Sequence, residues 1–124
     1  MDKIKSILII EDELPLQNAI KIKMKNNDFV VYTARDVEGA FKVLKNETIS
    51  VIWLDHYLLG EENGLDFVTK LKNDEENKKI PIFVVSNTAS PEKVRTYIKL
   101  GINNFFTKAN NKLEDIIMEI NQSI

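Results

Sequence analysis

The sequence predicts an α/β fold in which a five-stranded parallel sheet is covered by helices on both faces. Five short apolar runs alternate with five stretches whose apolar residues repeat at helical spacing. Continuous apolar runs are typical of strands that are buried on both faces of a parallel sheet. Because crossover connections between parallel strands are right-handed, few arrangements remain, and 2-1-3-4-5 is a common strand order at this length.

The strands are expected where apolar residues run without interruption. The first run ends at the acidic residues Glu11 and Asp12, and the third run ends at Asp55. Pro81 stands at the start of the fourth run, where a missing N–H donor is tolerated. The expected strands span residues 6–10, 29–34, 50–54, 82–85 and 105–107.

The helices are expected between the strands, where apolar residues recur every three or four positions. Pro15 suits the first turn of the first helix, while Asp36 and Ser90 are expected N-caps of the second and fourth. Gly101 is the expected C-cap of the fourth helix. The apolar stripes are Leu16, Ala19, Ile20 and Met24; Val37, Ala40, Phe41 and Leu44; Leu65, Val68 and Leu71; Val94, Tyr97 and Ile98; and Leu113, Ile116, Ile117 and Ile120.

Length and composition exclude several classes of function. The 124 residues suffice for one domain, expected to span residues 1–124. The 17 Lys and Arg against 19 Asp and Glu give a net charge of −2, without the basic excess of a nucleic-acid binder. The absence of cysteine excludes disulfides and thiol nucleophiles, and one histidine cannot form a His-rich metal site. No apolar run is long enough for a membrane span or a signal peptide, so the cytoplasm is the expected compartment.

Polar residues follow four of the five expected strands at their carboxyl ends. Glu11 and Asp12 follow the first strand, Asp55 the third, Ser86 the fourth and Lys108 the fifth. In the doubly wound, flavodoxin-like order 2-1-3-4-5, the first and third strands are neighbours, and a ligand crevice lies between them. We therefore expect three carboxylates to cluster at this crevice, with a hydroxyl and an ammonium group beside them.

Such a cluster predicts a magnesium-assisted phosphoryl site. Three clustered carboxylates repel one another and need a cation, and hard oxygen ligands without His or Cys select Mg²⁺. The metal and Lys108 would neutralise phosphoryl oxygens, and Ser86 would donate a hydrogen bond. Asp55 is the best candidate for a carboxylate that becomes an aspartyl phosphate, because it lies centrally between the acidic pair and the Ser86–Lys108 side.

Four segments resemble the signature segments of response-regulator receiver domains, the CheY-like family of two-component systems. They are Ile-Leu-Ile-Ile-Glu-Asp-Glu at 7–13, Trp-Leu-Asp at 53–55, Val-Val-Ser at 84–86 and Phe-Phe-Thr-Lys at 105–108. The resemblance covers essentially the whole chain. It implies that Asp55 accepts a phosphoryl group from the phosphohistidine of a histidine kinase. It also implies that Asp12 binds Mg²⁺ directly, Glu11 binds it through a water, and Tyr57 binds it through its backbone carbonyl.

The resemblance further implies how the signal leaves the site. Ser86 matches the switch hydroxyl, Lys108 the phosphate-binding lysine and Phe105 the switch aromatic. The expected signalling face comprises the fourth helix, the fifth strand and the fifth helix. The implied partners are a histidine kinase or phosphotransfer protein, a downstream effector or output domain, and a second copy in a phosphorylation-dependent homodimer. The domain would be no enzyme beyond self-catalysed phosphoryl transfer and autodephosphorylation.

The chain departs from the family pattern near the site. Ala109 replaces the proline that usually follows the lysine, Leu59 stands where a proline is usual, and Asn87 is bulkier than the usual residue. Gly64 comes one residue later than usual, which indicates an insertion. Because a cis bond before a non-proline residue costs about 2.5–4 kcal/mol, we predict a trans Lys108–Ala109 bond. We expect His56, a lone histidine, to be a loop side chain over the rim without a catalytic role.

The sequence argues against two other kinds of protein and leaves a third open. A flavodoxin-type electron carrier needs a Ser/Thr/Gly-rich phosphate loop after the first strand, and Glu-Asp-Glu-Leu-Pro at 11–15 carries the opposite charge. A haloacid-dehalogenase-like phosphatase needs two aspartates separated by one residue at that position, which the chain lacks. A receiver-fold interaction module that is never phosphorylated remains an open alternative. The sequence also leaves open whether the domain stands alone or is part of a longer protein.

Overall fold

A computed structural model describes residues 4–88 and 90–124 and shows the alternating α/β order that the sequence predicts. Residues 1–3 and 89 of the expected domain lie outside the described residues. The strands are β1 (Ser6–Ile10), β2 (Val30–Ala34), β3 (Val51–Leu54), β4 (Ile82–Ser86) and β5 (Asn104–Thr107), and the helices are α1 (Leu14–Asn26), α2 (Val37–Asn46), α3 (Gly64–Lys72), α4 (Pro91–Leu100) and α5 (Leu113–Ser123).

The five strands form one parallel sheet in the order β2-β1-β3-β4-β5, which confirms the predicted topology. Ile10, the last residue of β1, pairs with Ala34 of β2 and with Leu54 of β3. The register therefore brings the ends of these three strands level. Whatever follows them in the sequence is presented at the same edge of the sheet.

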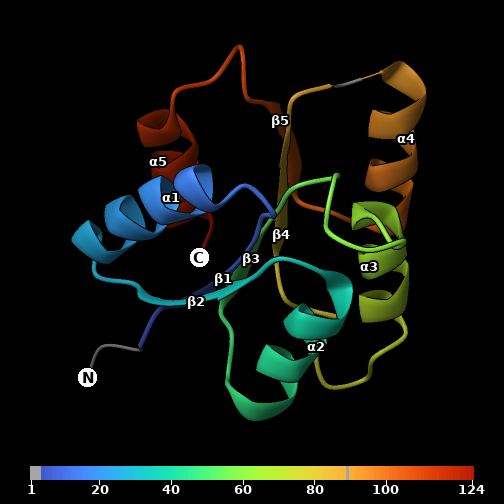
Figure 1. The fold of residues 1–124 in the computed structure, drawn as a ribbon, viewed down its shortest axis with the longest axis horizontal. Coiled ribbons are helices and arrows are strands. Elements are labelled where there is room, and N and C mark those ends of the chain that lie inside the picture. Colours follow the sequence, from blue (N-terminus) through green and yellow to red (C-terminus); the bar gives the residue numbers. More distant parts are fainter. Residues whose placement is uncertain (1–3, 89) are drawn as a thin grey trace.

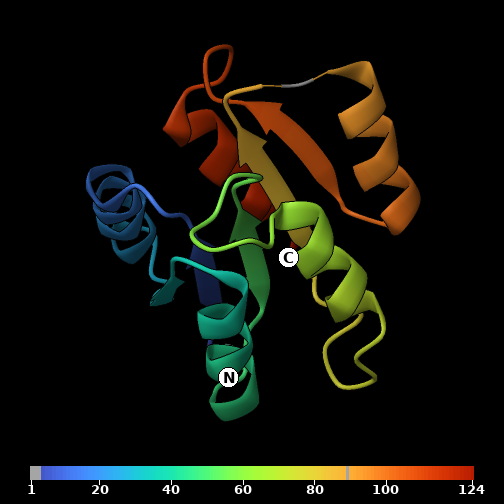
Figure 2. The same ribbon diagram turned by 45° about the vertical axis from the view of Figure 1, so that its right-hand side comes forward.

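Helices cover both faces of the sheet. Figure 1 shows α1 and α5 on one side and α2, α3 and α4 on the other, and Figure 2 shows the loop after β3 passing in front of the sheet toward α3. Within β1, Ile7 and Ile9 pack with the α1/α5 layer, while Leu8 and Ile10 pack with the opposite layer. This alternation explains why the strand is apolar at every position, since each face of the sheet has its own core.

The central and edge strands differ in burial. All residues of β1, β3 and β4 are buried, whereas β2 and β5 are largely half-buried because each lies at an edge of the sheet. The expectation that all five runs are buried on both faces is therefore wrong for the two edge strands. Strand bounds differ from the expected ones by a single residue at most at each end.

Capping residues fix the ends of two helices. The Asp36 side chain accepts a hydrogen bond from Gly39 N (2.7 Å), and the Ser90 hydroxyl accepts one from Lys93 N (3.3 Å). Gly101 ends α4 with φ 96°, a left-handed conformation that glycine adopts without strain. These three caps confirm the predicted ones. No helix in the described part of the chain is long and apolar enough to cross a membrane.

Candidate functional site

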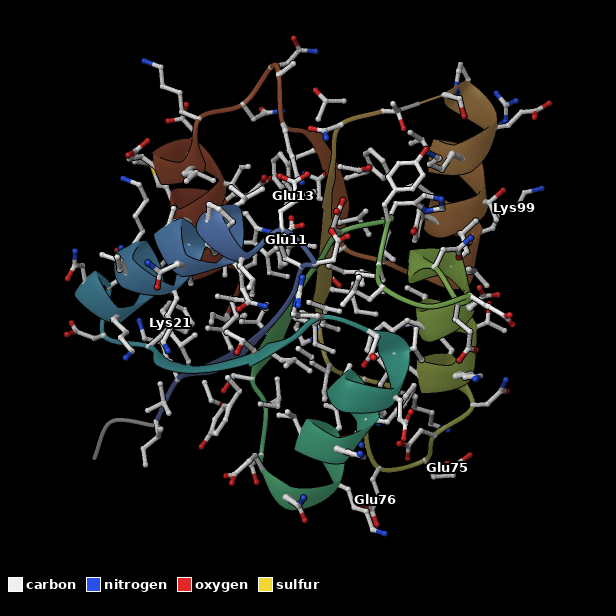
Figure 3. The ribbon with its side chains drawn as sticks, viewed as in Figure 1. Glu11, Glu13, Lys21, Glu75, Glu76 and Lys99 are labelled. Atoms are coloured by element: carbon white, nitrogen blue, oxygen red, sulfur yellow. The ribbon has the colours of Figure 1, made fainter. Side chains whose placement is uncertain are left out.

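The site lies at the carboxyl ends of β1 and β3. Glu11 directly follows β1, and its backbone N–H donates to Ala34 O (3.0 Å). Asp55 directly follows β3, and its N–H donates to Ile10 O (2.9 Å). The sheet itself thus holds the backbone of both acids. Figure 3 shows Glu11 near the centre of the molecule, whereas Lys99 projects from α4 at the periphery.

Three carboxylates and one ammonium group meet here, and we call Glu11, Asp12, Asp55 and Lys108 the acidic pocket. One oxygen from each acid lies within 4.8 Å of the others. Lys108 Nζ lies 2.9 Å from Glu11 Oε1 and 3.6 Å from Asp55 Oδ2. Glu11 and Asp55 are buried, while Asp12 is half-buried. Three negative charges and one positive charge leave the acidic pocket with a formal charge of −2.

Burial disfavours the charged forms of Glu11 and Asp55. Burial raises the pKa of Glu11 to about 7, and the charge of Asp55 adds to this, against the opposing effect of Lys108. Burial likewise raises the pKa of Asp55, although Lys108 and the His56 N–H oppose the shift. Burial alone would lower the pKa of Lys108, but its hydrogen bond to Glu11 and the Asp55 charge outweigh this and raise it.

The donor set of the acidic pocket fits a hard divalent cation. All three candidate ligands are carboxylates, the preferred ligands of Mg²⁺, and they are close enough to share one ion. A cation would also offset the repulsion that raises the Glu11 pKa. Glu11 Oε2 accepts a hydrogen bond from Glu13 N (3.1 Å), which orients the carboxylate within the pocket.

The backbones of Ser86 and Lys108 are hydrogen-bonded to each other. Ser86 is the last residue of β4, and its backbone oxygen accepts a hydrogen bond from Lys108 N (2.9 Å). The Ser86 hydroxyl is buried and has no hydrogen-bond partner among the described residues. A buried hydroxyl without a partner is costly in a folded protein, and it leaves a hydrogen-bonding group available for a ligand.

Tyr57 stands at the exposed rim of the site. Its side chain is half-exposed, and Lys93 Nζ lies 4.9 Å from the centroid of its ring. Lys93 also donates to the Tyr57 hydroxyl (3.3 Å) and to Thr88 Oγ1 (2.8 Å). These contacts join the loop after β3 to the start of α4. They lower the pKa of Tyr57, mainly through its hydrogen bonds to Thr88 and Lys93.

The expectation that His56 is a loop side chain over the rim is wrong. It is buried, and its Nδ1 lies 2.7 Å from the hydroxyl of Tyr97 in α4. Burial lowers the pKa of His56 and favours the neutral imidazole, whose tautomer decides which of the two groups donates the hydrogen bond. The ring of Tyr97 also packs against Phe105, with centroids 5.7 Å apart. The sequence predicts Tyr97 only as part of an apolar stripe.

Arg35 is a second residue whose part in the site could not be predicted from the sequence. Its guanidinium donates two hydrogen bonds to the backbone oxygen of Asp12, at 2.8 and 3.1 Å. Its own backbone oxygen accepts one from Leu59 N (3.0 Å). Arg35 therefore links the loop after β1 to the loop after β3, on either side of the acidic pocket. A single exposed arginine after a strand gives no sequence signal for such a role.

The chain departs from the family pattern at the Lys108–Ala109 bond and in the loop before α3, and the structure describes both. No cis peptide bond is present in the described residues, which confirms the predicted trans Lys108–Ala109 bond. The loop before α3 ends in a capping box, in which Asn63 Oδ1 accepts from Asp66 N (3.1 Å) and Asp66 accepts from Asn63 N (2.8 Å). Within that loop Gly60 adopts φ 84°. The loop before α3 is thus closed by local hydrogen bonds.

The fold and the acidic pocket together define a receiver domain, a class of domain that accepts phosphoryl groups and is not an enzyme in the ordinary sense. The chain belongs to the response regulator receiver domain family, whose sequence model matches residues 7–121. Receiver domains bind Mg²⁺ at an acidic pocket, and Glu11, Asp12 and Asp55 form a group of acids that could hold a metal ion.

Named relatives agree with this assignment. The chain is 28% identical over 119 residues to a chemotaxis protein CheY homolog of Campylobacter jejuni, covering 90% of this chain and 91% of the relative. It is 29% identical over 104 residues to chemotaxis protein CheY1 of Helicobacter pylori, covering 82% and 83%. The solved receiver protein of Pseudomonas putida superposes with a TM-score of 0.90 at 21% identity, covering 98% of this chain and 99% of that one. Chemotaxis response regulator CheY4 of Vibrio cholerae gives 0.87 at 19% identity, covering 98% and 100%.

Proposed function

We propose that this receiver domain, spanning residues 1–124, is the phosphorylation-activated switch of a two-component system and that Asp55 is its phosphoacceptor. The observation that carries the proposal is the position of Asp55. Its carboxylate is buried, lies in an oxygen cluster with Glu11 and Asp12, and has Lys108 Nζ 3.6 Å away. The donor would be the phosphohistidine of a histidine kinase or of a phosphotransfer protein.

In the proposed transfer one bond to phosphorus forms and one breaks. A carboxylate oxygen of Asp55 forms a new P–O bond while the P–N bond of the phosphohistidine breaks. The imidazole nitrogen of the donor keeps the electron pair of that bond and takes up a proton from the solvent. Lys108 neutralises phosphoryl oxygen charge, and the unpartnered Ser86 hydroxyl donates a hydrogen bond to it.

Mg²⁺ would be held by Asp12, Asp55, the backbone carbonyl of Tyr57 and, through a water, Glu11. When bound, the ion supplies charge neutralisation for the transferring group. The chain's own contribution is to orient these ligands: Arg35 fixes the backbone at Asp12, and the β3 register fixes Asp55. No further catalytic activity is proposed beyond self-catalysed transfer and the later loss of the phosphoryl group.

The proposed output is a change on the face formed by α4, β5 and α5. Ser86 and Lys108 adjust to the phosphoryl oxygens, and Phe105 in β5 responds as the switch aromatic. A downstream effector, an output domain or a second copy of the chain would bind this face. The proposed compartment is the cytoplasm.

Incubation with Mg²⁺ and acetyl phosphate tests the proposal. Mass spectrometry should show the gain of one phosphoryl group in the wild type and no gain in Asp55→Asn. Asp28→Asn is a matched control, because Asp28 is an exposed aspartate outside the acidic pocket whose positive φ asparagine tolerates. Labelling of Asp55→Asn at the wild-type rate would refute the assignment. Absence of labelling and of beryllofluoride binding in the wild type would instead favour an interaction module that is never phosphorylated.

A further inference from the structure

A buried hydrogen bond joins the residue after Asp55 to the middle of α4. His56 Nδ1 and the Tyr97 hydroxyl lie 2.7 Å apart, although 41 residues separate them in the chain. Tyr97 is fully buried and His56 is 7% exposed, so water does not compete for this bond. Their rings meet edge to face, with centroids 5.8 Å apart. A bond of this kind restrains both partners, because breaking it leaves two buried polar atoms unpaired.

The backbone of His56 contacts the proposed phosphoacceptor directly. His56 N–H donates to Asp55 Oδ1 at 2.8 Å. One residue therefore binds the Asp55 carboxylate through its main chain and α4 through its side chain. A change in the charge or direction of the Asp55 carboxylate alters its hydrogen bond with the His56 N–H. Because the imidazole is attached to the same residue, a shift of the His56 backbone also moves the hydrogen bond between Nδ1 and Tyr97.

Gly64 leaves space beside His56 for the Tyr97 hydroxyl. Gly64, the first residue of α3, donates its N–H to His56 O (2.8 Å). A side chain at position 64 would overlap the Tyr97 hydroxyl and would lie 3.0 Å from the backbone oxygen of Asp55. The absence of a side chain at Gly64 thus leaves the path from Tyr97 to His56 open.

The same tyrosine reaches the expected switch aromatic. The Tyr97 ring packs at 5.7 Å and an angle of 54° against the ring of Phe105 in β5. The contacts run in sequence from Asp55 to His56, to Tyr97 and to Phe105. This route crosses the layer that contains α4 and does not pass through Ser86 or Lys108.

We propose that His56 and Tyr97 are a positioning pair that orients the phosphoacceptor loop and couples the occupancy of Asp55 to the position of α4. The proposal rests on the proposed function, because it assigns a regulatory path to the same site. The two residues act through Asp55 and do not contact the phosphoryl group themselves. The position of α4 then depends on the hydrogen bond between His56, beside Asp55, and Tyr97, within α4.

Backbone amide NMR with Mg²⁺ and beryllofluoride, a mimic of the phosphoryl group, tests the pair. In the wild type, amides of the acidic pocket and of residues 92–100 should both shift. In Tyr97→Phe, which keeps the ring and removes the hydroxyl, pocket amides should still shift, while those of residues 92–100 should respond less than about half as much. Beryllofluoride affinity should fall by about 2- to 10-fold, the factor to which one net hydrogen bond corresponds.

Two further variants separate positioning from simple packing. His56→Leu should reduce the α4 response and the beryllofluoride affinity as Tyr97→Phe does. The double variant should lose no more of either than the single variants, because both substitutions remove the same hydrogen bond. His56→Asn places an acceptor near the position of Nδ1 and should restore the α4 response. Tyr32→Phe is the matched control, since the Tyr32 hydroxyl donates to Glu47 (3.0 Å) outside this path.

The outcomes distinguish the two proposals. A full α4 response and unchanged or tighter affinity in Tyr97→Phe would overturn the positioning pair and leave the phosphoacceptor assignment intact. Lack of any pocket response in the wild type would overturn both. If the variants do not fold, the wild type alone decides, because the single histidine of the chain gives one imidazole ¹⁵N signal pair. An unmoved Nδ1 signal on beryllofluoride addition would also overturn the pair.

Discussion

Raising the pH in the absence of divalent cations should destabilise the protein through Glu11. Its pKa is raised from 4.5 to about 7 in the folded state, chiefly by burial. Between these two values the folded state holds a proton that the unfolded state has released. Stability therefore falls as the pH rises through this window, and the destabilisation is complete above about pH 7.

The magnitude follows from the size of the shift. A difference of about 2.5 pKa units corresponds to about 3 kcal/mol. This is a large part of a typical stability of about 5–15 kcal/mol. Glu11→Gln removes the charge but keeps an oxygen that can accept the hydrogen bond from Lys108. The variant should match the wild type near pH 4.5 and exceed it by about 3 kcal/mol above about pH 7.

Urea unfolding of both proteins in a chelator, across this pH range, measures the difference. The lowered pKa of His56 makes stability rise with pH below its ordinary value, and this contribution is present in both proteins and cancels. Saturating Mg²⁺ should reverse the trend in the wild type, because the ion binds deprotonated carboxylates. If the free energy of unfolding changed equally with pH in the wild type and in Glu11→Gln in chelator, the reasoning would be refuted.

Three further outcomes are expected. Asp12→Ala should weaken Mg²⁺ binding, measured by calorimetry, more than Glu11→Ala does, because direct ligation places charge closer to the ion; equal losses would contradict this. Gly64→Ala should lower the free energy of unfolding by about 1–3 kcal/mol, because the new methyl group meets the Tyr97 hydroxyl, and a thermal shift upward would count against it. Asp36→Ala should cost about 1 kcal/mol through loss of the α2 cap while Asp36→Asn costs little, which denaturant midpoints can check.

Local pattern was sufficient to predict most of the fold. The strand at 6–10 could be predicted because an apolar run stops at two acids, and Asp36 and Gly101 mark helix ends by their own chemistry. The meeting of Glu11, Asp12 and Asp55 also followed from the sequence, since parallel strands present their carboxyl ends at one edge. Such inferences need only periodicity, capping and topology.

Pairings between distant side chains could not be predicted in the same way. His56 and Tyr97 lie 41 positions apart, and a tyrosine in an apolar stripe carries no sign of where its hydroxyl will bind. The pairing of Arg35 with the backbone at Asp12 depends on how two loops fold back. Likewise, the sequence predicts a lysine near three acids but not that Lys108 lies nearer Glu11 than Asp55.

The charge of the acidic pocket limits what a partner protein can sense from a distance. Its formal charge of −2 equals that of the whole chain, so the remaining charged residues balance one another. A bound Mg²⁺ would neutralise the pocket, and conversion of the Asp55 carboxylate to an acyl phosphate of charge about −2 would then add only about one negative unit. The field of this one added negative charge would be largely screened beyond about 8 Å in physiological salt. A partner docking on α4, β5 and α5 would therefore have to distinguish the two forms by shape and contact and not by long-range attraction.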